Sequence, residues 1–251
     1  PATLLCGIKT GKSITVSAGV HSREYIGIET LIRLAQELTP EMVRGTILLL
    51  HCCNYKGFLS RSSDVMPQDR KNLNRVFPGK KDGTLSERIA WTITEKLQSK
   101  ADYYIDLHAG DTSEEVMPFV YYNVAAGDQI AEISERMAMA ADMEVRASST
   151  AATGAYSSAC RRGLPAILME RGGGGRFTEE EVASLCEKYK MDGEEVKCWY
   201  DGYSFDKVPA VYSPRSVVSC MRFGKIGNYW NQTETFEALK IYIDMNFDGL
   251  R

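Results

Sequence analysis

The sequence predicts an α/β fold in which a mixed, mostly parallel sheet is flanked by helices and followed by a small all-β appendix. Short β-prone runs alternate with segments of helical period through about the first three-quarters of the chain, which is the order that a parallel sheet requires. From about Glu194 the helical period disappears, and short β-prone pieces interrupted by proline and glycine take its place. We therefore expect a large first domain over residues 1–193 and a small β-rich domain over residues 194–251.

The first half of the chain begins with a strand, a helix and a second strand. Residues 13–18 form a β-prone run that ends at Gly19, and apolar residues then recur with helical period over residues 24–38. Residues 46–50 form a continuous apolar strand. The polar stretch over residues 54–83 follows neither period, and a loop of that length in a compact domain is usually functional.

The next elements are marked by capping boxes and by further apolar runs. Thr84-Leu85-Ser86-Glu87 places a hydroxyl N-cap three residues before a glutamate, which predicts a helix that runs to about residue 97. Thr178-Glu179-Glu180-Glu181 repeats the pattern and predicts a helix to about residue 190. Between these two helices we expect strands at residues 103–107, 116–122 and 166–169 and a helix over residues 129–141.

The composition excludes several classes of protein. In 251 residues, 44% are hydrophobic and 25% charged, as in an ordinary soluble globular protein, and the net charge of -3 does not favour nucleic acid or an anionic membrane as a partner. No apolar run approaches the length of a membrane span, and the first residues lack the charge pattern of a signal peptide. The seven scattered cysteines form no Cys-x-x-Cys pair, which favours reduced, mostly buried thiols and a cytoplasmic location. A homo-oligomer remains open.

Two of the three histidines lie where a catalytic metal site would be built. His21 and Glu24 are three residues apart at a junction of loop and helix, so both can face one point, and His108 ends a separate predicted strand. Two imidazoles and one carboxylate leave a fourth position on Zn²⁺ open, which is typical of a catalytic site with one ion per chain. The alternative is a chance His-x-x-Glu spacing on an exposed helix and a structural histidine at a strand end. The carboxyl ends of strands, where open α/β sheets bind ligands, favour the metal site. His51 lies within an apolar strand and is interpreted as structural.

Other polar residues lie where they could support this chemistry. Asp106 precedes His108 by two residues, so it can point to the same face of the strand and hold the free ring nitrogen of the histidine. Glu170 ends the apolar run 166–169, and a carboxylate beside a zinc-activated water is an efficient general base, although an ion pair with Arg171 is the alternative. The glycines at 172–175 suggest tight backbone near a site.

The loop over residues 54–83 contains an adjacent amide and guanidinium, Asn74 and Arg75. Loop arginines are mostly solvated, but this pair offers several directed donors that suit bidentate capture of a substrate carboxylate.

Four motifs in order carry a resemblance to a known family. His-Ser-Arg-Glu (21–24), Asn-Leu-Asn-Arg-Val-Phe-Pro-Gly (72–79), Asp-Leu-His-Ala-Gly-Asp (106–111) and a late strand-end glutamate resemble the zinc carboxypeptidase superfamily and, within it, the succinylglutamate desuccinylase/aspartoacylase family. The resemblance covers about residues 12–190. It implies Zn²⁺ bound by His21, Glu24 and His108, with Glu170 as general base and acid and with Asn74 and Arg75 on the substrate carboxylate. It also implies an upstream arginine that polarises the scissile carbonyl, for which Arg61 is our choice and Arg70 competes.

The resemblance implies a zinc-dependent amidohydrolase that cleaves a small-molecule N-acyl amino acid, in the manner of a deacylase or desuccinylase. A metallocarboxypeptidase acting on short peptides is the alternative, because His-Ser-Arg-Glu is closer to true carboxypeptidases, whereas Phe-Pro-Gly and His-Ala-Gly-Asp favour the deacylases. A non-catalytic scaffold on the same fold would need none of these residues. The sequence leaves open the acyl group and the amino acid.

Overall fold

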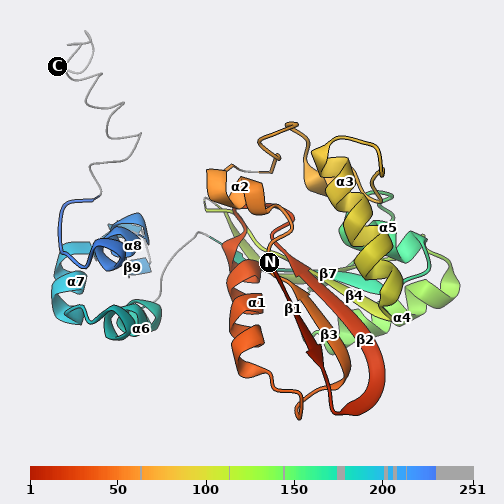
Figure 1. Cartoon of the computed structure of the whole chain (residues 1–251), viewed down its shortest axis with the longest axis horizontal. Coiled ribbons are helices and arrows are strands. Elements are labelled where there is room, and N and C mark those ends of the chain that lie inside the picture. The colour runs from red at the N-terminus through yellow and green to blue at the C-terminus, as the bar shows by residue number, and fades with distance from the viewer. Residues whose placement is uncertain are drawn as a thin grey trace, which may run out of the picture. The chain divides into compact units, whose positions relative to one another are not determined.

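The computed structural model of the chain describes residues 1–229, apart from residues 63, 113, 144, 174–178, 201–202, 206–207 and 213. The chain divides into two compact units, Pro1–Gly175 and Arg176–Arg251 (Figure 1). The sequence places the domain boundary later, after residue 193. The difference concerns the helix Glu179–Tyr189, whose buried residues Val182 and Cys186 pack with the apolar cluster of the second unit.

The first unit is built on a seven-stranded sheet with the order β1-β3-β2-β4-β7-β5-β6. The strands are β1 (Ala2–Cys6), β2 (Lys9–Ala18), β3 (Arg44–Leu50), β4 (Tyr103–His108), β5 (Glu115–Asn123), β6 (Val145–Ser149) and β7 (Ala166–Gly173). The pairs β2–β3, β2–β4, β4–β7 and β5–β6 are parallel, whereas β1–β3 and β5–β7 are antiparallel. The prediction of a mixed, mostly parallel sheet is confirmed.

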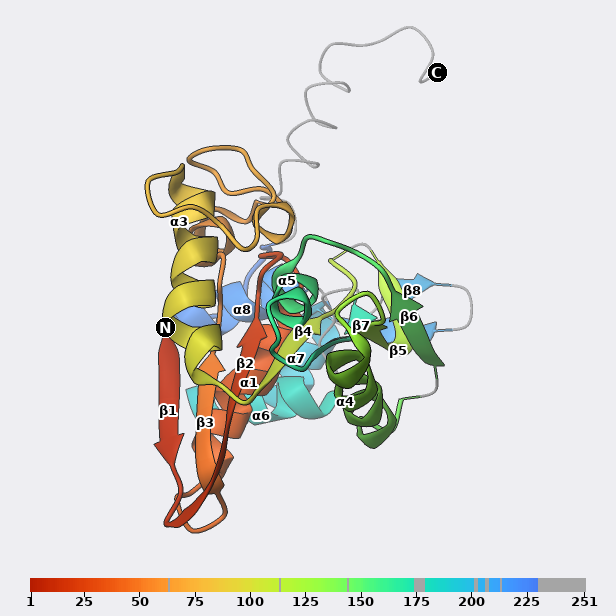
Figure 2. The same cartoon turned by 90° about the vertical axis from the view of Figure 1, so that its right-hand side faces the viewer.

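Two strands that the sequence did not reveal form the edges of the sheet. Figure 2 shows β1 beside β3 at one edge and β6 at the other. The sequence of β6, Val-Arg-Ala-Ser-Ser, lacks an apolar run because an edge strand that is mostly exposed need not bury both faces. The strands in the middle of the sheet are covered on both faces and therefore carry the apolar runs that predicted them.

Helices cover both faces of the sheet (Figure 1). They are α1 (Tyr25–Glu37), α2 (Tyr55–Ser60), α3 (Leu85–Thr92), α4 (Asp128–Ala140) and α5 (Ala155–Arg161). On one face, Ile28 and Leu31 of α1 pack into a cluster with Val16 of β2. On the other face, α3 and α5 share a cluster with Tyr104 of β4 and Leu168 of β7. The opposite faces of β4 therefore contact different helices.

The capping box before α3 is confirmed. The Thr84 side chain accepts from the backbone N–H three residues on, and Thr84 N donates to Glu87 Oε2 at 2.8 Å. The helix continues without interruption through a π-helical turn over Ile93–Leu97, as the sequence predicts. The capping box predicted at Thr178 lies outside the described residues.

The long loop over residues 54–83 is ordered both by local hydrogen bonds and by Leu73 and Phe77, which are buried in the apolar cluster beneath α3 and α5. It contains α2, an antiparallel bridge between Val65 and Asn72, and a 3-10 turn, η1 (Leu73–Arg75). Asp69 accepts hydrogen bonds from both the backbone and the hydroxyl of Ser86 at 2.7 Å, which fixes the loop to the start of α3. The loop can therefore hold side chains in defined positions.

The described part of the second unit contains helices, so the prediction of an all-β appendix is wrong for residues 194–229. Its described elements are α6 (Glu179–Tyr189), α7 (Gly193–Tyr200), the hairpin strands β8 (Tyr203–Phe205) and β9 (Val208–Val211), and α8 (Pro214–Phe223). Asp192 caps α7 by accepting from Glu194 N and Glu195 N. Pro214 is the first residue of α8, a position that suits proline. In the sequence alone, the same proline indicates the end of a strand. Residues 230–251 of the predicted β-rich domain lie outside the described residues.

The prediction that most of the cysteines are buried is confirmed. All seven cysteines are free thiols, and only Cys6 and Cys198 are exposed. Among the described helices, none combines the length and apolar character needed to cross a membrane.

Candidate metal centre

The carboxyl ends of three adjacent strands bring the predicted residues together. β2, β4 and β7 are neighbours and run parallel, so their carboxyl ends lie at one edge of the sheet. His21 and Glu24 follow β2, His108 is the last residue of β4, and Glu170 of β7 pairs with His108 in the strand register. The chain leaves β2 for β3 on one side and later returns to β4 on the other, which makes this edge a topological switch point.

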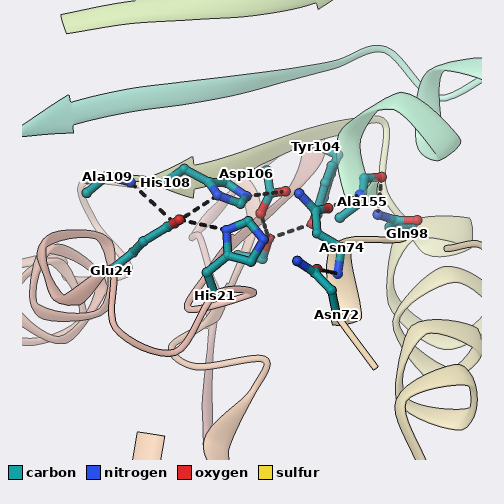
Figure 3. Close-up of polar contacts among 11 residues, drawn as sticks. His21, Glu24, Asn72, Asn74, Gln98, Tyr104, Asp106, His108, Ala109 and Ala155 are labelled. Atoms are coloured by element: carbon teal, nitrogen blue, oxygen red, sulfur yellow. Dashed lines mark hydrogen bonds and ion pairs between the residues drawn. The ribbon is translucent and has the colours of Figure 1, made fainter. Parts of the chain in front are cut away.

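The two histidines converge on one carboxylate (Figure 3). His21 Nδ1 lies 2.6 Å from Glu24 Oε1, and His108 Nδ1 lies 2.8 Å from Glu24 Oε2. One ligand atom from each of the three residues lies within 4.8 Å of the others. Glu24 and His108 are buried and His21 is half-buried, so the cluster is not a chance gathering of exposed charges.

These residues fit a metal ion. Imidazole nitrogens and a carboxylate are the donors that zinc and similar divalent ions take in catalytic sites. The other ring nitrogen of His21, Nε2, is buried without a hydrogen-bond partner among the described residues. The His21 ring is therefore oriented by its Nδ1 contact with Glu24 and by an edge contact with the ring of His108, on the side where the three ligand atoms meet.

The electrostatics keep the carboxylate ionised. Burial alone would raise the pKa of Glu24, but hydrogen bonds from His108 and His21 outweigh it and lower the pKa to about 2. Burial opposes a charge on His108, yet the carboxylates of Asp106 and Glu24 raise the pKa of its ring well above the usual value. The Glu24 carboxylate is thus negatively charged throughout the physiological pH range, as a carboxylate that binds a metal must be.

Asp106 lies behind His108 on the same face of β4. Its Oδ2 is 3.1 Å from His108 Nε2, and the residue is fully buried. The aspartate therefore contacts the ring nitrogen that faces away from Glu24. This is the geometry in which a carboxylate fixes the tautomer of a ligand histidine.

Glu170 is half-buried beside this cluster. Burial raises its pKa to about 7, and the nearby charge of His108 lowers the pKa only in part. No ion pair with Arg171 is found among the described residues, so the carboxylate is not neutralised by its neighbour. A carboxyl group with a pKa near neutrality can both accept and donate a proton.

Gly172 and Gly173 adopt backbone conformations that favour glycine, and Gly173 in addition packs closely on neighbouring backbone. Gly172 and Gly173 have φ values of 69° and 154°, in the region that favours glycine. A Cβ at Gly173 would lie 1.9 Å from the carbonyl oxygen of Glu114, and a Cβ at Gly172 would lie 2.7 Å from Ile26. The described part of the glycine run thus lets the loop after β4 pack directly on the end of β7.

Asn74 and Arg75 differ in their surroundings. Asn74 is buried in η1, and its Oδ1 accepts a hydrogen bond of 3.0 Å from Ala155 N, the first residue of α5 (Figure 3). Arg75 is exposed, and its guanidinium makes no hydrogen bond or ion pair within the described part of the chain. The structure therefore fixes the amide in place and leaves the guanidinium available.

The two candidate arginines of the loop share an unusual backbone conformation. Arg61 and Arg70 are exposed and have φ values of 52° and 55°, which non-glycine residues seldom adopt. Ser22 donates a 2.5 Å hydrogen bond to the carbonyl of Ser62, so the backbone after Arg61 is fixed to the segment between His21 and Glu24. Arg70 instead follows Asp69, which is fixed to α3.

Sequence reasoning missed two residues beneath the cluster. Ser17 Oγ donates to Asp106 Oδ1 at 2.7 Å and lies 2.5 Å from the hydroxyl of Tyr104. The signal was present in β4, because Tyr104, Asp106 and His108 alternate along the strand and so share one face.

The fold and the cluster together define a class of α/β protein in which the carboxyl ends of a mostly parallel sheet carry two histidines and a carboxylate that fit a metal ion. Within that class, the chain belongs to the succinylglutamate desuccinylase/aspartoacylase family, since residues 10–188 match the Succinylglutamate desuccinylase/Aspartoacylase catalytic domain. The family predicted from the four motifs is confirmed.

Individual relatives agree with this assignment. The chain is 31% identical over 176 residues to the N-alpha-acetyl-L-2,4-diaminobutyric acid deacetylase of Halomonas elongata, covering 69% of this chain and 51% of the relative. It is similar in structure to a succinylglutamate desuccinylase/aspartoacylase from Rhodobacter sphaeroides (27% identity, TM-score 0.64, 73% of this chain and 55% of the other). It is also similar to the product-bound ectoine utilization protein EutE (DoeB) from Ruegeria pomeroyi (28% identity, TM-score 0.65, 72% and 56%). The chain thus spans about half the length of the curated relative.

Proposed function

We propose that the chain is a zinc-dependent amidohydrolase that cleaves an N-acyl amino acid into a carboxylic acid and the free amino acid. Membership of the family supports this reaction, and the relative from Halomonas elongata carries the name of an N-acetyl amino acid deacetylase. The observation on which the proposal rests is the convergence of His21, Glu24, His108 and Glu170 at the ends of three adjacent strands.

One zinc ion per chain would be held by His21 Nδ1, His108 Nδ1 and the Glu24 carboxylate, the three groups that already meet. When bound there, zinc supplies a Lewis acid that polarises the amide carbonyl and lowers the pKa of water towards neutrality. Asp106 would hold His108 through Nε2.

Glu170 is the proposed general base and acid. It takes a proton from the attacking water at a carboxylate oxygen and delivers that proton to the leaving nitrogen, which departs as the amine of the free amino acid. The two transfers require a group whose pKa lies close to the working pH. The raised pKa of about 7, caused by burial, meets this requirement.

Asn74 and Arg75 are the proposed binding groups for the α-carboxylate of the substrate. Because Ala155 N holds Asn74 Oδ1, the side-chain amide of Asn74 presents its N–H donors rather than its oxygen. None of the described residues occupies the donors of the Arg75 guanidinium, which can form two parallel hydrogen bonds with a carboxylate. The pair therefore suits an anionic group.

Arg61 is the proposed donor to the oxygen that becomes negatively charged during attack. The hydrogen bond from Ser22 to the carbonyl of Ser62 supports Arg61 over Arg70, since it holds the neighbouring backbone beside the ligand segment.

A substrate panel tests the proposed function. Purified protein supplemented with zinc is assayed against N-acetyl, N-succinyl and N-formyl amino acids and against dipeptides, while bound metal is quantified in the same sample. Turnover of N-acyl amino acids by a zinc-loaded protein is the expected result. Preferential cleavage of dipeptides would assign a carboxypeptidase instead. Zinc below about half an equivalent, with no turnover, would favour a non-catalytic scaffold.

Replacing Arg75 by alanine is expected to lower kcat/KM by roughly tenfold to a hundredfold, because a charge-assisted contact contributes about 1.5–3 kcal/mol. Arg75→Lys should recover only part of the loss, since an ammonium lacks the planar fork. Arg136→Ala, which removes an exposed arginine from α4, is the matched control and should behave as wild type.

A substrate analogue distinguishes recognition from a general loss of activity. Wild type should discriminate strongly against a substrate whose α-carboxylate is replaced by a neutral amide, and Arg75→Ala should discriminate much less. If both proteins discriminate equally, Arg75 does not bind the carboxylate.

Arg61→Ala is expected to lower kcat by about 10²–10³-fold, the usual cost of removing a donor to a developing oxyanion. Arg70→Ala should stay close to wild type. The two variants are well matched, because both arginines are exposed and both occupy left-handed backbone positions, so alanine changes the backbone strain similarly. Steady-state kinetics on the same substrate decide between them, and the reverse pattern would assign the role to Arg70.

A further inference from the structure

A buried series of hydrogen bonds runs from Tyr104, near the start of β4, to the candidate ligand His108 at its end. Tyr104 OH lies 2.5 Å from Ser17 Oγ, Ser17 Oγ lies 2.7 Å from Asp106 Oδ1, and Asp106 Oδ2 lies 3.1 Å from His108 Nε2 (Figure 3 labels Tyr104, Asp106 and His108). Tyr104, Ser17 and Asp106 have no exposed surface, and His108 is 4% exposed. Water therefore has little access to any of these groups.

The direction of these hydrogen bonds follows from the groups themselves. Asp106 is an acceptor, so the single proton of Ser17 points to Asp106 Oδ1. The hydroxyl of Tyr104 must then donate to Ser17 Oγ, which has no second proton to give. At the other end, Asp106 Oδ2 accepts from His108 Nε2–H. The proton on Nε2 leaves Nδ1 as the ligand atom, and Nδ1 is the atom that faces Glu24.

The backbone fixes this order. Tyr104, Asp106 and His108 occupy alternate positions on β4, and Ser17 on β2 is the register partner of Asp106. The neighbouring thiol of Cys53 adds no charge, because burial raises its pKa well above the usual value and keeps it protonated. Asp106 thus has one neutral donor, Ser17, on the oxygen that does not face the histidine.

We propose that Ser17 and Tyr104 are positioning residues for the metal site, an inference that rests on the proposed zinc function. Ser17 holds Asp106 in the rotamer that meets His108 Nε2, and Tyr104 holds Ser17. Together they select the His108 tautomer that can bind a metal through Nδ1. Without Ser17, one oxygen of a fully buried carboxylate loses its donor, so Asp106 can rotate away from the ring.

The test measures metal affinity rather than activity. Zinc is titrated into metal-free wild type, Ser17→Ala, Tyr104→Phe and the double variant in competition with a chromophoric chelator. Ser17→Ala is expected to bind zinc about 10–100-fold more weakly, the usual effect of losing an outer partner of a ligand histidine. Tyr104→Phe should show a smaller loss. The double variant should match Ser17→Ala within about twofold, because Tyr104 acts through Ser17.

Two buried hydroxyls elsewhere in the protein, outside this series of hydrogen bonds, provide matched controls. Ser134 accepts from Ala166 N near the start of β7, and Tyr200 OH donates to Gly227 O in the second unit. Ser134→Ala and Tyr200→Phe should lower the melting temperature of the metal-free protein yet leave zinc affinity unchanged. Ser17→Thr, which keeps a hydroxyl, should restore affinity and also provides a reading if Ser17→Ala does not fold.

The outcomes separate this inference from the proposed function. Wild type that binds no zinc overturns both. Wild type that binds zinc while Ser17→Ala and Tyr104→Phe bind it equally well overturns only the positioning role. The same follows if Ser134→Ala weakens zinc binding as much as Ser17→Ala does, because the effect would then reflect general stability.

Discussion

Glutamine in place of Glu170 is expected to lower kcat by about 10²–10⁴-fold, while zinc content and KM stay close to wild type. Glutamine keeps the shape and polarity of the side chain but cannot accept a proton from water. Glu170 contributes to none of the three ligand positions, so the metal should be retained. Steady-state kinetics and metal analysis of the same preparation check both parts. A Glu170→Gln protein that loses zinc would make Glu170 a ligand or a structural residue.

The same variant has a second measurable consequence in the metal-free protein. Burial raises the pKa of Glu170 from 4.5 to about 7, so between these pH values the folded state binds the proton more tightly than the unfolded state. Stability is therefore lost as pH rises through this window. Glu170→Gln removes this penalty and should be more stable than wild type at pH 8, by on the order of 3 kcal/mol, but not at pH 4. Denaturant unfolding at both pH values measures the difference.

Alanine in place of His108 is expected to abolish zinc retention and activity. The substitution removes one of only three protein donors and leaves Asp106 as a buried carboxylate without the imidazole that it contacts. His21→Ala should have the same effect on zinc. Equilibrium dialysis followed by elemental analysis measures the loss.

His51 supplies the control for these variants. It is also buried, but its Nε2 contacts Thr3 Oγ1 at 2.8 Å, and it belongs to no ligand cluster among the described residues. His51→Ala should therefore keep a full equivalent of zinc even if the protein is less stable. Full zinc and activity in His108→Ala would show that the metal site has been assigned to the wrong residues.

Much of the first unit could be predicted because burial on both faces of a sheet leaves a clear pattern. β2, β3, β4, β5 and β7 were all predicted from apolar or β-prone runs, since their positions inside the sheet require such side chains. The edge strands β1 and β6 carry no such requirement and were missed. The helices α7 and α8 of the second unit were missed because they are short and begin beside Gly193 and Pro214, residues that also interrupt strands.

The histidines and carboxylates of the candidate site could be predicted from the sequence for a different reason. Histidines and carboxylates at strand ends can be ranked from sequence, because chemistry demands those residue types at that edge. The sequence favours Arg61 but leaves Arg70 as a competitor, and the support for Arg61 comes from a hydrogen bond that Ser22 donates to the carbonyl of Ser62, two serines without a local signal. Ser17 escaped notice for the same reason, because its importance comes only from its register with Asp106.

The position of β7 has a consequence for the order in which the fold can be completed. β5 and β6 precede β7 in the chain, yet in the sheet β5 meets the remaining strands only through β7. A chain that has emerged from the ribosome only as far as β6 therefore holds two separate strand groups, β1-β3-β2-β4 and β5-β6. That nascent chain already contains His21, Glu24 and His108, but Glu170 arrives with the strand that joins the groups. The three proposed metal ligands can thus be present during synthesis before the proposed general base, and under the proposed function hydrolysis requires the complete sheet.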